Sequence, residues 1–284
     1  MNSWELEEEC FYINGVDKNG GGPNIFAYRL KEELTSRGKA FRAPGGNKFS
    51  KKFVNLSVIS GQYLPGAKNV LRLDGLHFDS LDKYTDQKND YIFKSYAEFD
   101  RVIFQSKFSK AMYERVTGLV RPNDIIPNGV TKDFSPMKRK YHSIENMFPD
   151  LRRFKRICVA SAAWRRHKRL EEIIEAFSSP RLKDVGLAVL GGYGYKDKLP
   201  YGDNVLILPR FPIEYIPEVY AIADAMIHIA WLDWCPNTVV EALACGTPVL
   251  CSHNGGTHEL VKNDGLTIQL EEDYEIGKQV PLYN

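Results

Sequence analysis

The chain has 284 residues, a formal net charge of +2, 43% hydrophobic residues and 12% aromatic residues. This composition is that of a folded globular protein with one large domain or two moderate ones, and it excludes a wholly disordered chain. No apolar run approaches the roughly 20 residues that cross a membrane. The acidic start MNSWELEEEC lacks the apolar core of a secretory signal, so no such leader is expected.

The five cysteines are an odd number and include no C-x-x-C pair. We therefore expect reduced thiols and a cytoplasmic protein rather than a disulfide framework. None of the six histidines stands at a metal-ligand spacing from another histidine or from a cysteine, so no metal site is predicted.

The first half of the chain, residues 1–131, predicts one α/β domain. An apolar run at 10–13 indicates a strand, and three glycines at 20–22 follow it before a helix that reaches residue 37. Glycines between a strand and a helix allow a ligand to approach the backbone closely, although a plain turn is the alternative. The remaining elements expected here are strands at 54–59, 69–73, 101–104 and 124–126 and helices at 88–99 and 107–116.

Two candidate active-site residues, Asp74 and His77, follow the strand at 69–73. In open α/β sheets the ligand binds beyond the carboxyl ends of the strands, so polar side chains at this position are functional candidates. An ordinary Asp-Gly turn and a structural histidine are the alternatives.

Lysines at positions 48, 51 and 52 precede the strand at 54–59. Such a group is most often a solvated face. The alternative is contact with a phosphorylated acceptor or with an anionic membrane surface, which keeps a peripheral membrane contact as a hypothesis.

The second half, residues 132–284, predicts a second α/β domain that begins with a polar linker at 132–154. Strands that alternate with helices should pair in parallel through right-handed crossovers. The expected strands lie at 157–160, 186–190, 205–208, 225–230 and 247–251, and the expected helices at 170–177, 213–222, 238–245 and 258–262.

Four cations surround His167 after the first strand of this second domain: Arg165, Arg166, Lys168 and Arg169. These charges repel one another unless an anion lies among them. A diphosphate supplies that charge, since an arginine can bind it with two parallel hydrogen bonds and a lysine as a point charge. A basic surface for nucleic acid is the alternative, but the nearly balanced total charge offers no broad basic face, and no nucleic-acid partner is expected.

Two polar turns, at 231–238 and 252–257, each follow a predicted strand, which places both at the ligand edge of the sheet. Asn237 is expected to cap the next helix and to leave the amides of residues 238–240 directed at this edge. Unpaired amides and the helix dipole together favour an anion at this position.

Asp233 lies in the first of these turns, and Glu241 lies one turn into the helix that follows. A carboxylate beside an anion site can hold the hydroxyl groups of a ribose, and a second carboxylate can face a sugar. The ordinary alternative is that Glu241 only occupies the first helical turn and that Asp233 only solvates the loop.

Together these features resemble the donor site of retaining glycosyltransferases of the GT-B fold, family four. That family carries an acidic residue, seven residues and a glutamate, then a Gly-x-Pro-Val run and a Gly-Gly-x-x-Glu turn. This chain has Asp233 in place of the usual first glutamate, then Glu241, Gly-Thr-Pro-Val at 246–249 and Gly-Gly-Thr-His-Glu at 255–259. In the first half, the glycine loop and the Ile-Pro-Asn-Gly-Val turn at 126–130 also resemble the family.

The resemblance implies two Rossmann-like α/β/α domains that face each other across a cleft, an acceptor-side domain at 1–131 and a donor-binding domain at 132–284. It implies an enzyme that moves a sugar from a nucleoside-diphosphate-sugar to a hydroxyl of a glycan, a lipid-linked acceptor or a small molecule, with retention at the anomeric carbon. Neither a metal nor a cofactor is expected.

The implied site residues form two groups. The catalytic group comprises Asp74, His77, Asp233 and Glu241. The donor-binding group combines glycines and cations that follow strands with the start of one helix, and comprises Gly21, Gly22, Arg165, Lys168, Gly192, Arg210, Pro236, Asn237, Thr238, Val239 and Glu241.

Two other classes stay open. A nicotinamide or flavin oxidoreductase would need G-x-G-x-x-G between a strand and a helix, and neither 20–22 nor 191–194 completes that spacing. A non-catalytic sugar-nucleotide-binding protein with a degenerate glycosyltransferase fold is the stronger alternative, because the first domain is short and the family's last helices are missing. Slow hydrolysis of the donor would distinguish an enzyme from such a binding protein.

Overall fold

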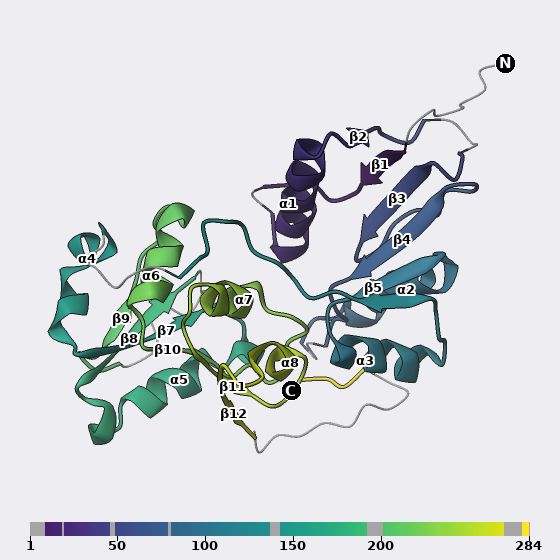
Figure 1. Ribbon diagram of the computed structural model, residues 1–284. Helices are drawn as coiled ribbons and strands as arrows, with labels where there is room; N and C mark the ends of the chain where they lie inside the picture. The colour runs from purple at the N-terminus through teal and green to yellow at the C-terminus, as the bar shows by residue number, and fades with distance from the viewer. Residues whose placement is uncertain are drawn as a thin grey trace. The chain divides into compact units, whose positions relative to one another are not determined.

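The computed structural model describes residues 9–18, 20–45, 49–78, 81–136, 143–191, 201–269 and 280–283. Of these, 9–127 and 280–283 form one compact unit and 128–269 form a second (Figure 1). Each unit is built on its own six-stranded parallel sheet, so the predicted α/β class with two parallel sheets is confirmed. Within the described ranges, no helix combines the length and the apolar character that a membrane crossing needs.

The division between the units lies at 127/128, close to the predicted end of the first domain at residue 131. The described residues 280–283 group with the first unit, although the sequence placed them in the second. Here the backbone amide of Tyr283 donates a hydrogen bond to the carbonyl oxygen of Phe78 at 2.8 Å.

In the first unit the strands run in the order β2-β1-β3-β4-β5-β6, and all neighbours are parallel. The chain leaves β1 toward β2 and returns to β3 on the other side of β1, so the topological switch point lies between β1 and β3. The elements are β1 (Cys10–Ile13), α1 (Gly22–Ser36), β2 (Ala40–Phe41), β3 (Phe53–Val58), β4 (Lys68–Leu73), α2 (Thr85–Glu98), β5 (Arg101–Phe104), α3 (Lys107–Thr117) and β6 (Asn123–Ile125).

In the second unit the strands run in the order β12-β11-β10-β7-β8-β9, again all parallel. The chain moves from β7 outward to β9 and then crosses to β10 on the other side of β7, which puts the switch point between β7 and β10. The strands are β7 (Arg156–Ser161), β8 (Val185–Leu190), β9 (Val205–Ile207), β10 (Ala225–His228), β11 (Val249–Ser252) and β12 (Gly265–Ile268). The helices are α4 (Ser143–Met147), α5 (Leu170–Phe177), α6 (Ile216–Ile222), α7 (Asn237–Ala244) and α8 (Thr257–Val261).

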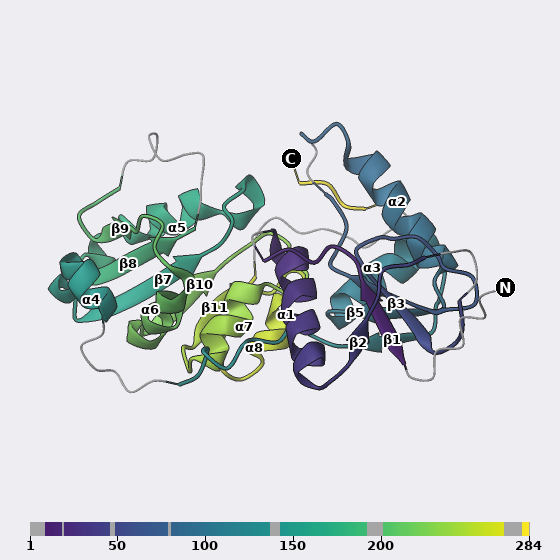
Figure 2. The same ribbon diagram turned by 90° about the horizontal axis from the view of Figure 1, so that it is seen from above.

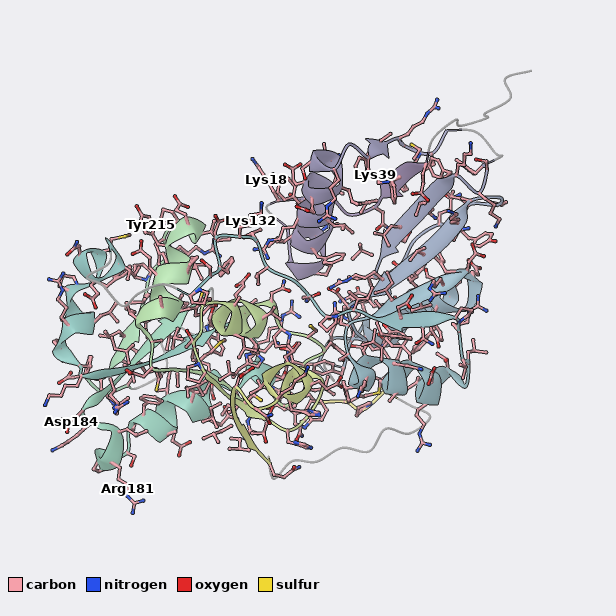
Figure 3. The ribbon with its side chains drawn as sticks, in the orientation of Figure 1. Lys18, Lys39, Lys132, Arg181, Asp184 and Tyr215 are labelled. Carbon is pink, nitrogen blue, oxygen red and sulfur yellow. The ribbon has the colours of Figure 1, made fainter. Side chains whose placement is uncertain are left out.

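The sheet of the second unit is covered on both faces, as the near-continuous apolar runs of its strands require. Figure 2 shows α5 on one face and α6 and α7 on the other. Neighbouring residues of β8 divide between two cores, since Val189 packs with α5 whereas Leu190 packs with α6 and α7. The charged residues Arg181 and Asp184, near the 3₁₀ helix η3 (Pro180–Leu182), project away from the ribbon into solvent (Figure 3).

The segment predicted as a polar linker is partly folded, which corrects the sequence analysis. It contains α4 and the 3₁₀ helix η1 (Pro149–Arg153), whose Ile144 and Leu151 are buried in the core of the second unit. The side chain of Glu218 on α6 accepts a hydrogen bond from the backbone amide of Ile144 at 3.1 Å. A few apolar side chains spaced among charged ones are enough to dock short helices, and composition alone does not reveal them.

Candidate functional site

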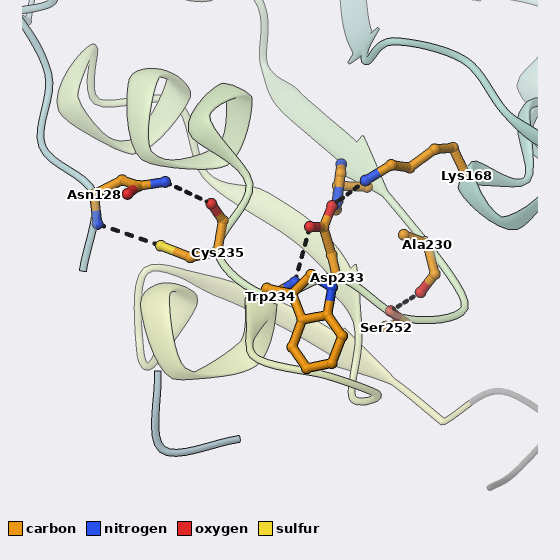
Figure 4. Close-up of polar contacts among 8 residues, drawn as sticks. Asn128, Lys168, Ala230, Asp233, Trp234, Cys235 and Ser252 are labelled. Carbon is orange, nitrogen blue, oxygen red and sulfur yellow. Dashed lines mark hydrogen bonds and ion pairs between the residues drawn. The ribbon is translucent and has the colours of Figure 1, made fainter. Parts of the chain in front are cut away.

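The carboxyl ends of β7 and β10 meet at the switch point of the second unit, where open α/β sheets bind their ligands. Lys168 comes from the 3₁₀ helix η2 (Arg166–Lys168) after β7, and Asp233 comes from the loop after β10. Their side chains form an ion pair (Figure 4). Two of the predicted site residues are thus brought together by the topology of the sheet.

The Asp233 carboxylate has three hydrogen-bond partners. One oxygen, Oδ2, accepts from Lys168 Nζ and lies 3.0 Å from Nε2 of His228. The other oxygen, Oδ1, accepts from the backbone amide of Trp234 at 2.9 Å. The side chain of Asp233 is 11% exposed and that of Lys168 is 16% exposed, so the pair is largely shielded from water.

The charge state of this cluster follows from burial and from the partners. Burial favours a neutral Asp233, but Lys168 and His228 outweigh it and hold the pKa of the carboxyl below its usual range. Burial also lowers the pKa of His228, and the charge of Lys168 adds to this effect while Asp233 opposes it. The cluster is therefore an ionised Asp–Lys pair that contacts a neutral imidazole.

The buried His228 predicts a pH dependence of stability. Between the lowered pKa of the folded imidazole and about 6.5, the ordinary histidine value, the unfolded chain binds more protons than the folded protein. The free energy of unfolding should therefore fall as the pH drops below about 6.5. Urea titrations at about pH 7.5 and about pH 5.5 measure this change, and His228→Gln should show a smaller drop. An equal drop in both proteins would contradict the assignment to His228.

The Gly-Gly turn after β11 fixes the backbone of Asp233. The amide of Gly256 donates to the carbonyl oxygen of Asp233 at 2.7 Å. Gly255 has a φ of +75°, and a Cβ placed on it would overlap that carbonyl oxygen and lie 2.8 Å from the amide nitrogen of Asp233. Only glycine satisfies both conditions, which explains the glycine that the sequence shows at position 255.

The start of α7 differs from the prediction. Pro236 occupies the cap position and Asn237 is the first helical residue, so the prediction that Asn237 caps the helix is wrong. The amides of Val239 and Val240 both donate to the Pro236 carbonyl oxygen, at 3.1 and 3.2 Å, so they are not directed at the edge. At the start of α7, the amides of Asn237 and Thr238 have no acceptor among the described residues.

Asn128 anchors the loop that precedes α7. Its Nδ2 donates to Oδ1 of Asn237 at 2.7 Å and to the carbonyl oxygen of Cys235 at 2.9 Å, and its own amide contacts Cys235 Sγ at 3.4 Å. The turn at 126–130 therefore ties the beginning of the second unit to the loop that precedes α7.

We expect Asn128→Ala to lower the free energy of unfolding by about 1–2 kcal/mol, because it removes two hydrogen bonds from a half-buried amide. Ligand binding at the start of α7 should weaken as well, since the loop loses its anchor. Urea unfolding and calorimetric titration measure the two effects. Asn263→Ala, at an exposed asparagine of the same unit, serves as the control. A change no larger than in this control would contradict the anchoring role of Asn128.

Glu241 lies inside the second unit and is 8% exposed. Burial is the main cause that raises the pKa of Tyr220, and the negative charge of Glu241 adds to it. Burial likewise raises the pKa of Cys245 to about 11, again with a contribution from Glu241. The structure therefore places this carboxylate close to α6 and to the end of α7 rather than on a solvated first turn.

The remaining predicted donor residues lie in different environments. Arg165 and Arg210 are exposed, and the side chain of Val239 is fully buried in the core, so it offers no side-chain contact to a ligand. Lys168 ends η2 instead of opening α5, because Arg169 adopts a left-handed conformation between the two helices. Pro236 is buried, and Gly192 lies outside the described residues.

In the first unit, Asp74 follows β4 and is held by two buried groups. It forms an ion pair with Arg72 and accepts a hydrogen bond from Gln105 Nε2 at 2.5 Å. The guanidinium of Arg72, 2% exposed, lies 3.8 Å from the ring centroid of Phe26 on α1. Asp74 is thus fixed by its neighbours more firmly than a plain Asp-Gly turn would require.

His77 and the glycine loop complete the predicted residues of the first unit. The side chain of Asn89 on α2 holds the backbone of His77 with two hydrogen bonds. Its Oδ1 accepts from the amide of His77 at 2.8 Å, and its Nδ2 donates to the carbonyl oxygen of His77 at 2.8 Å. Gly22 begins α1, and Gly21 precedes it. A Cβ on Gly21 would meet only an ordinary contact at 3.9 Å, whereas one on Gly20 would come within 2.5 Å of the Asn24 side chain.

Four residues of these clusters were not selected from the sequence: Arg72, Gln105, Asn128 and His228. A single polar residue inside an apolar strand is a usable signal, because a buried polar group needs a partner. His228 within Ala225–His228 fits that pattern, whereas β4 carries Lys68 and Asn69 besides Arg72 and fits it less well. Asn128 lies in the Ile-Pro-Asn-Gly-Val turn that resembles the family, whereas Gln105 gives no comparable signal.

Comparison with known proteins adds independent findings. Residues 145–275, most of the second unit, match the family model of glycosyl transferases group 1. The second unit is therefore similar to a glycosyl transferases group 1 domain. Such a domain also accounts for the acidic, Gly-Thr-Pro-Val and Gly-Gly motifs that lie within it.

Two curated relatives illustrate the similarity. A putative glycosyltransferase, YtcC of Bacillus subtilis (strain 168), is 29% identical over 101 residues, which is 30% of this chain and 25% of the relative. D-inositol 3-phosphate glycosyltransferase of Mycobacterium sp. (strain KMS) is 30% identical over 112 residues, 35% of this chain and 25% of the relative. The matched part thus spans about a quarter of the length of these relatives.

Solved glycosyltransferase structures share the fold of both units. Sucrose-phosphate synthase from Thermosynechococcus elongatus has a TM-score of 0.73 at 16% identity, over 93% of this chain and 86% of that one. Anabaena HepE in complex with UDP has a TM-score of 0.64 at 14% identity, with the same coverage. The GT-B fold that the sequence implied is confirmed.

Proposed function

We propose that this protein is a glycosyltransferase that moves a sugar from a nucleoside-diphosphate-sugar to a hydroxyl acceptor. The observation that carries the proposal is the ammonium of Lys168, held by Asp233 at the switch point of a unit similar to a glycosyl transferases group 1 domain. The loop from Asp233 leads directly to α7, whose first two amides have no acceptor in the described chain.

These groups suit a diphosphate. An ammonium has three N–H donors, of which Lys168 uses one for Asp233, and the N-terminus of a helix favours negative charge. Donors fixed in advance around a leaving group stabilise the charge that develops on it. We therefore assign the donor diphosphate to Lys168 and to the amides of Asn237 and Thr238, in the role that a metal ion has in other transferases.

The other site residues receive roles within the same proposal. Glu241 would hold the ribose. Arg165 and Arg210, which are both exposed, would contact the bound sugar nucleotide. In the first unit, Asp74 and His77 would orient the acceptor hydroxyl. Transfer would proceed with retention by attack on the same face as the leaving diphosphate, so no protein nucleophile is assigned.

Glu241→Gln should raise the KM for the donor about tenfold or more, because a charged hydrogen bond to the ribose would be lost. The fold should survive, since the amide has nearly the shape of the carboxylate. Donor hydrolysis and circular dichroism measure the two properties. Glu175→Gln, at an exposed carboxylate on α5 outside the proposed site, is the control. Unchanged kinetics in a folded Glu241 variant would remove this residue from the site.

A thermal-shift panel of UDP-, GDP- and ADP-sugars, with and without EDTA, tests the proposed function. We expect one donor to raise Tm equally in both conditions, because a ligand that binds only the folded state stabilises it. UDP-sugars are the first candidates, since Anabaena HepE was solved with UDP and with UDP-glucose. Slow release of free sugar from that donor would mark an enzyme rather than a binding protein. No stabilisation by any of the donors would contradict the proposal.

A further inference from the structure

The carboxylate of Asp233 already forms hydrogen bonds with three groups of the protein. A carboxylate offers about four acceptor positions, and three of them are used, by Lys168, His228 and the amide of Trp234. The side chain is 11% exposed, and its backbone is held by Gly256 and by the close approach of Gly255. Rotation of this carboxylate toward a bound sugar would break several of these contacts.

His228 is the rigid part of this arrangement. It is the last residue of β10, a strand paired on both sides with β7 and β11, and it is 5% exposed. Its Nε2 atom lies 3.0 Å from the same oxygen that binds Lys168. As a donor, the imidazole fixes that oxygen relative to the sheet.

Lys168 is the flexible part. Its ammonium ends a four-carbon stem with many rotamers, and ordering such a side chain has an entropic cost. Apart from Asp233, the described residues provide no partner for the ammonium. The direction of the ammonium is therefore set by the carboxylate, and the position of the carboxylate is set by His228 and Trp234.

We propose that His228 and Asp233 are positioning residues for Lys168, and that Asp233 acts on the donor diphosphate through this lysine rather than on the transferred sugar. This inference rests on the proposed function, because it assumes that Lys168 binds the diphosphate. It reassigns Asp233 from a sugar contact to the support of a phosphate contact. It also gives a role to His228, which has no role in the proposed reaction itself.

The first test compares two ligands on Asp233→Asn by isothermal titration calorimetry. The probes are UDP and UDP-glucose, or the GDP or ADP pair if the wild-type protein prefers it. A positioning role predicts that both lose affinity by the same factor, about 10- to 100-fold, because both carry the diphosphate. A loss confined to UDP-glucose would show that Asp233 contacts the sugar, and would overturn the inference.

The second test is a double-mutant cycle with His228→Leu and Lys168→Met, which remains informative if Asp233→Asn does not fold. We expect His228→Leu to weaken UDP binding roughly three- to tenfold in the wild-type background and less than about twofold in the Lys168→Met background. His228→Gln, which can still donate to Asp233, should restore most of the affinity. Equal effects in both backgrounds would mean that His228 is merely structural, and would overturn the proposal.

The two failures are distinguishable. If the wild-type protein binds none of the diphosphates, the proposed function fails. If it binds one of them and the cycle shows no coupling between His228 and Lys168, only the positioning inference fails. Thermal unfolding of each variant, recorded without ligand, separates a general loss of stability from a loss of binding.

Discussion

Replacing Lys168 by methionine should weaken the binding of a nucleoside diphosphate about 10- to 100-fold, because a hydrogen bond to a charged group contributes about 1.5–3 kcal/mol. The change removes the cation that the structure holds at the switch point of the second unit. It also leaves the carboxylate of Asp233 without its counter-ion, and breaking a buried pair in this way costs about 3–5 kcal/mol. The pair is largely but not completely shielded from water, with 16% and 11% of the two side chains exposed, so the loss of stability should lie below that range.

Calorimetric titration with UDP and urea unfolding measure the two effects of Lys168→Met. Lys183→Met, at an exposed lysine beside the solvent-facing Arg181 and Asp184, is the matched control (Figure 3). That variant removes the same charge from the same unit but should change neither quantity measurably. Retention of wild-type affinity in a folded Lys168→Met protein would contradict the phosphate role of this residue.

Gly255→Ala should destabilise the second unit strongly, because Gly255 combines a positive φ with close contact to the backbone of Asp233. A left-handed conformation costs an alanine about 1–2 kcal/mol, and the added Cβ would also overlap the backbone of Asp233. We therefore expect the free energy of unfolding to fall by about 3 kcal/mol. Diphosphate binding should be lost with it, because the displaced loop carries both Asp233 and the entry to α7.

Gly246→Ala separates the cost of the left-handed conformation from the cost of the overlap with the backbone of Asp233. Gly246 also has a positive φ, +82°, but a Cβ there would meet only an ordinary contact with Pro136 at 3.8 Å. This variant should lose about 1–2 kcal/mol and keep its affinity for the ligand. If both variants lose the same stability and bind alike, the contact between the Gly-Gly turn and Asp233 does not support the site.

Most of the fold was predictable because its signals are local. The predicted limits of the strands at 10–13 and 101–104 and of the helix at 170–177 agree with β1, β5 and α5. Apolar periodicity and the glycines and prolines between elements determine such segments. The helices within 132–154 were missed because Ile144 and Leu151 become informative only when the rest of the unit packs around them.

The candidate site was predictable in its position and less so in its contacts. Parallel strands bring the loops after β7 and β10 to one switch point, so Lys168 and Asp233 could be expected near each other. Which groups they contact depends on side-chain geometry. The buried His228 and the clamp of Asn128 on the loop before α7 are tertiary contacts with no sequence spacing of their own.

A crystal structure of the protein with UDP, or with the diphosphate that the thermal-shift panel selects, tests the central claim most directly. The account predicts phosphate oxygens within hydrogen-bond distance of Lys168 Nζ and of the amides of Asn237 and Thr238. A nucleotide bound at full occupancy with its diphosphate outside the reach of all three groups would contradict it.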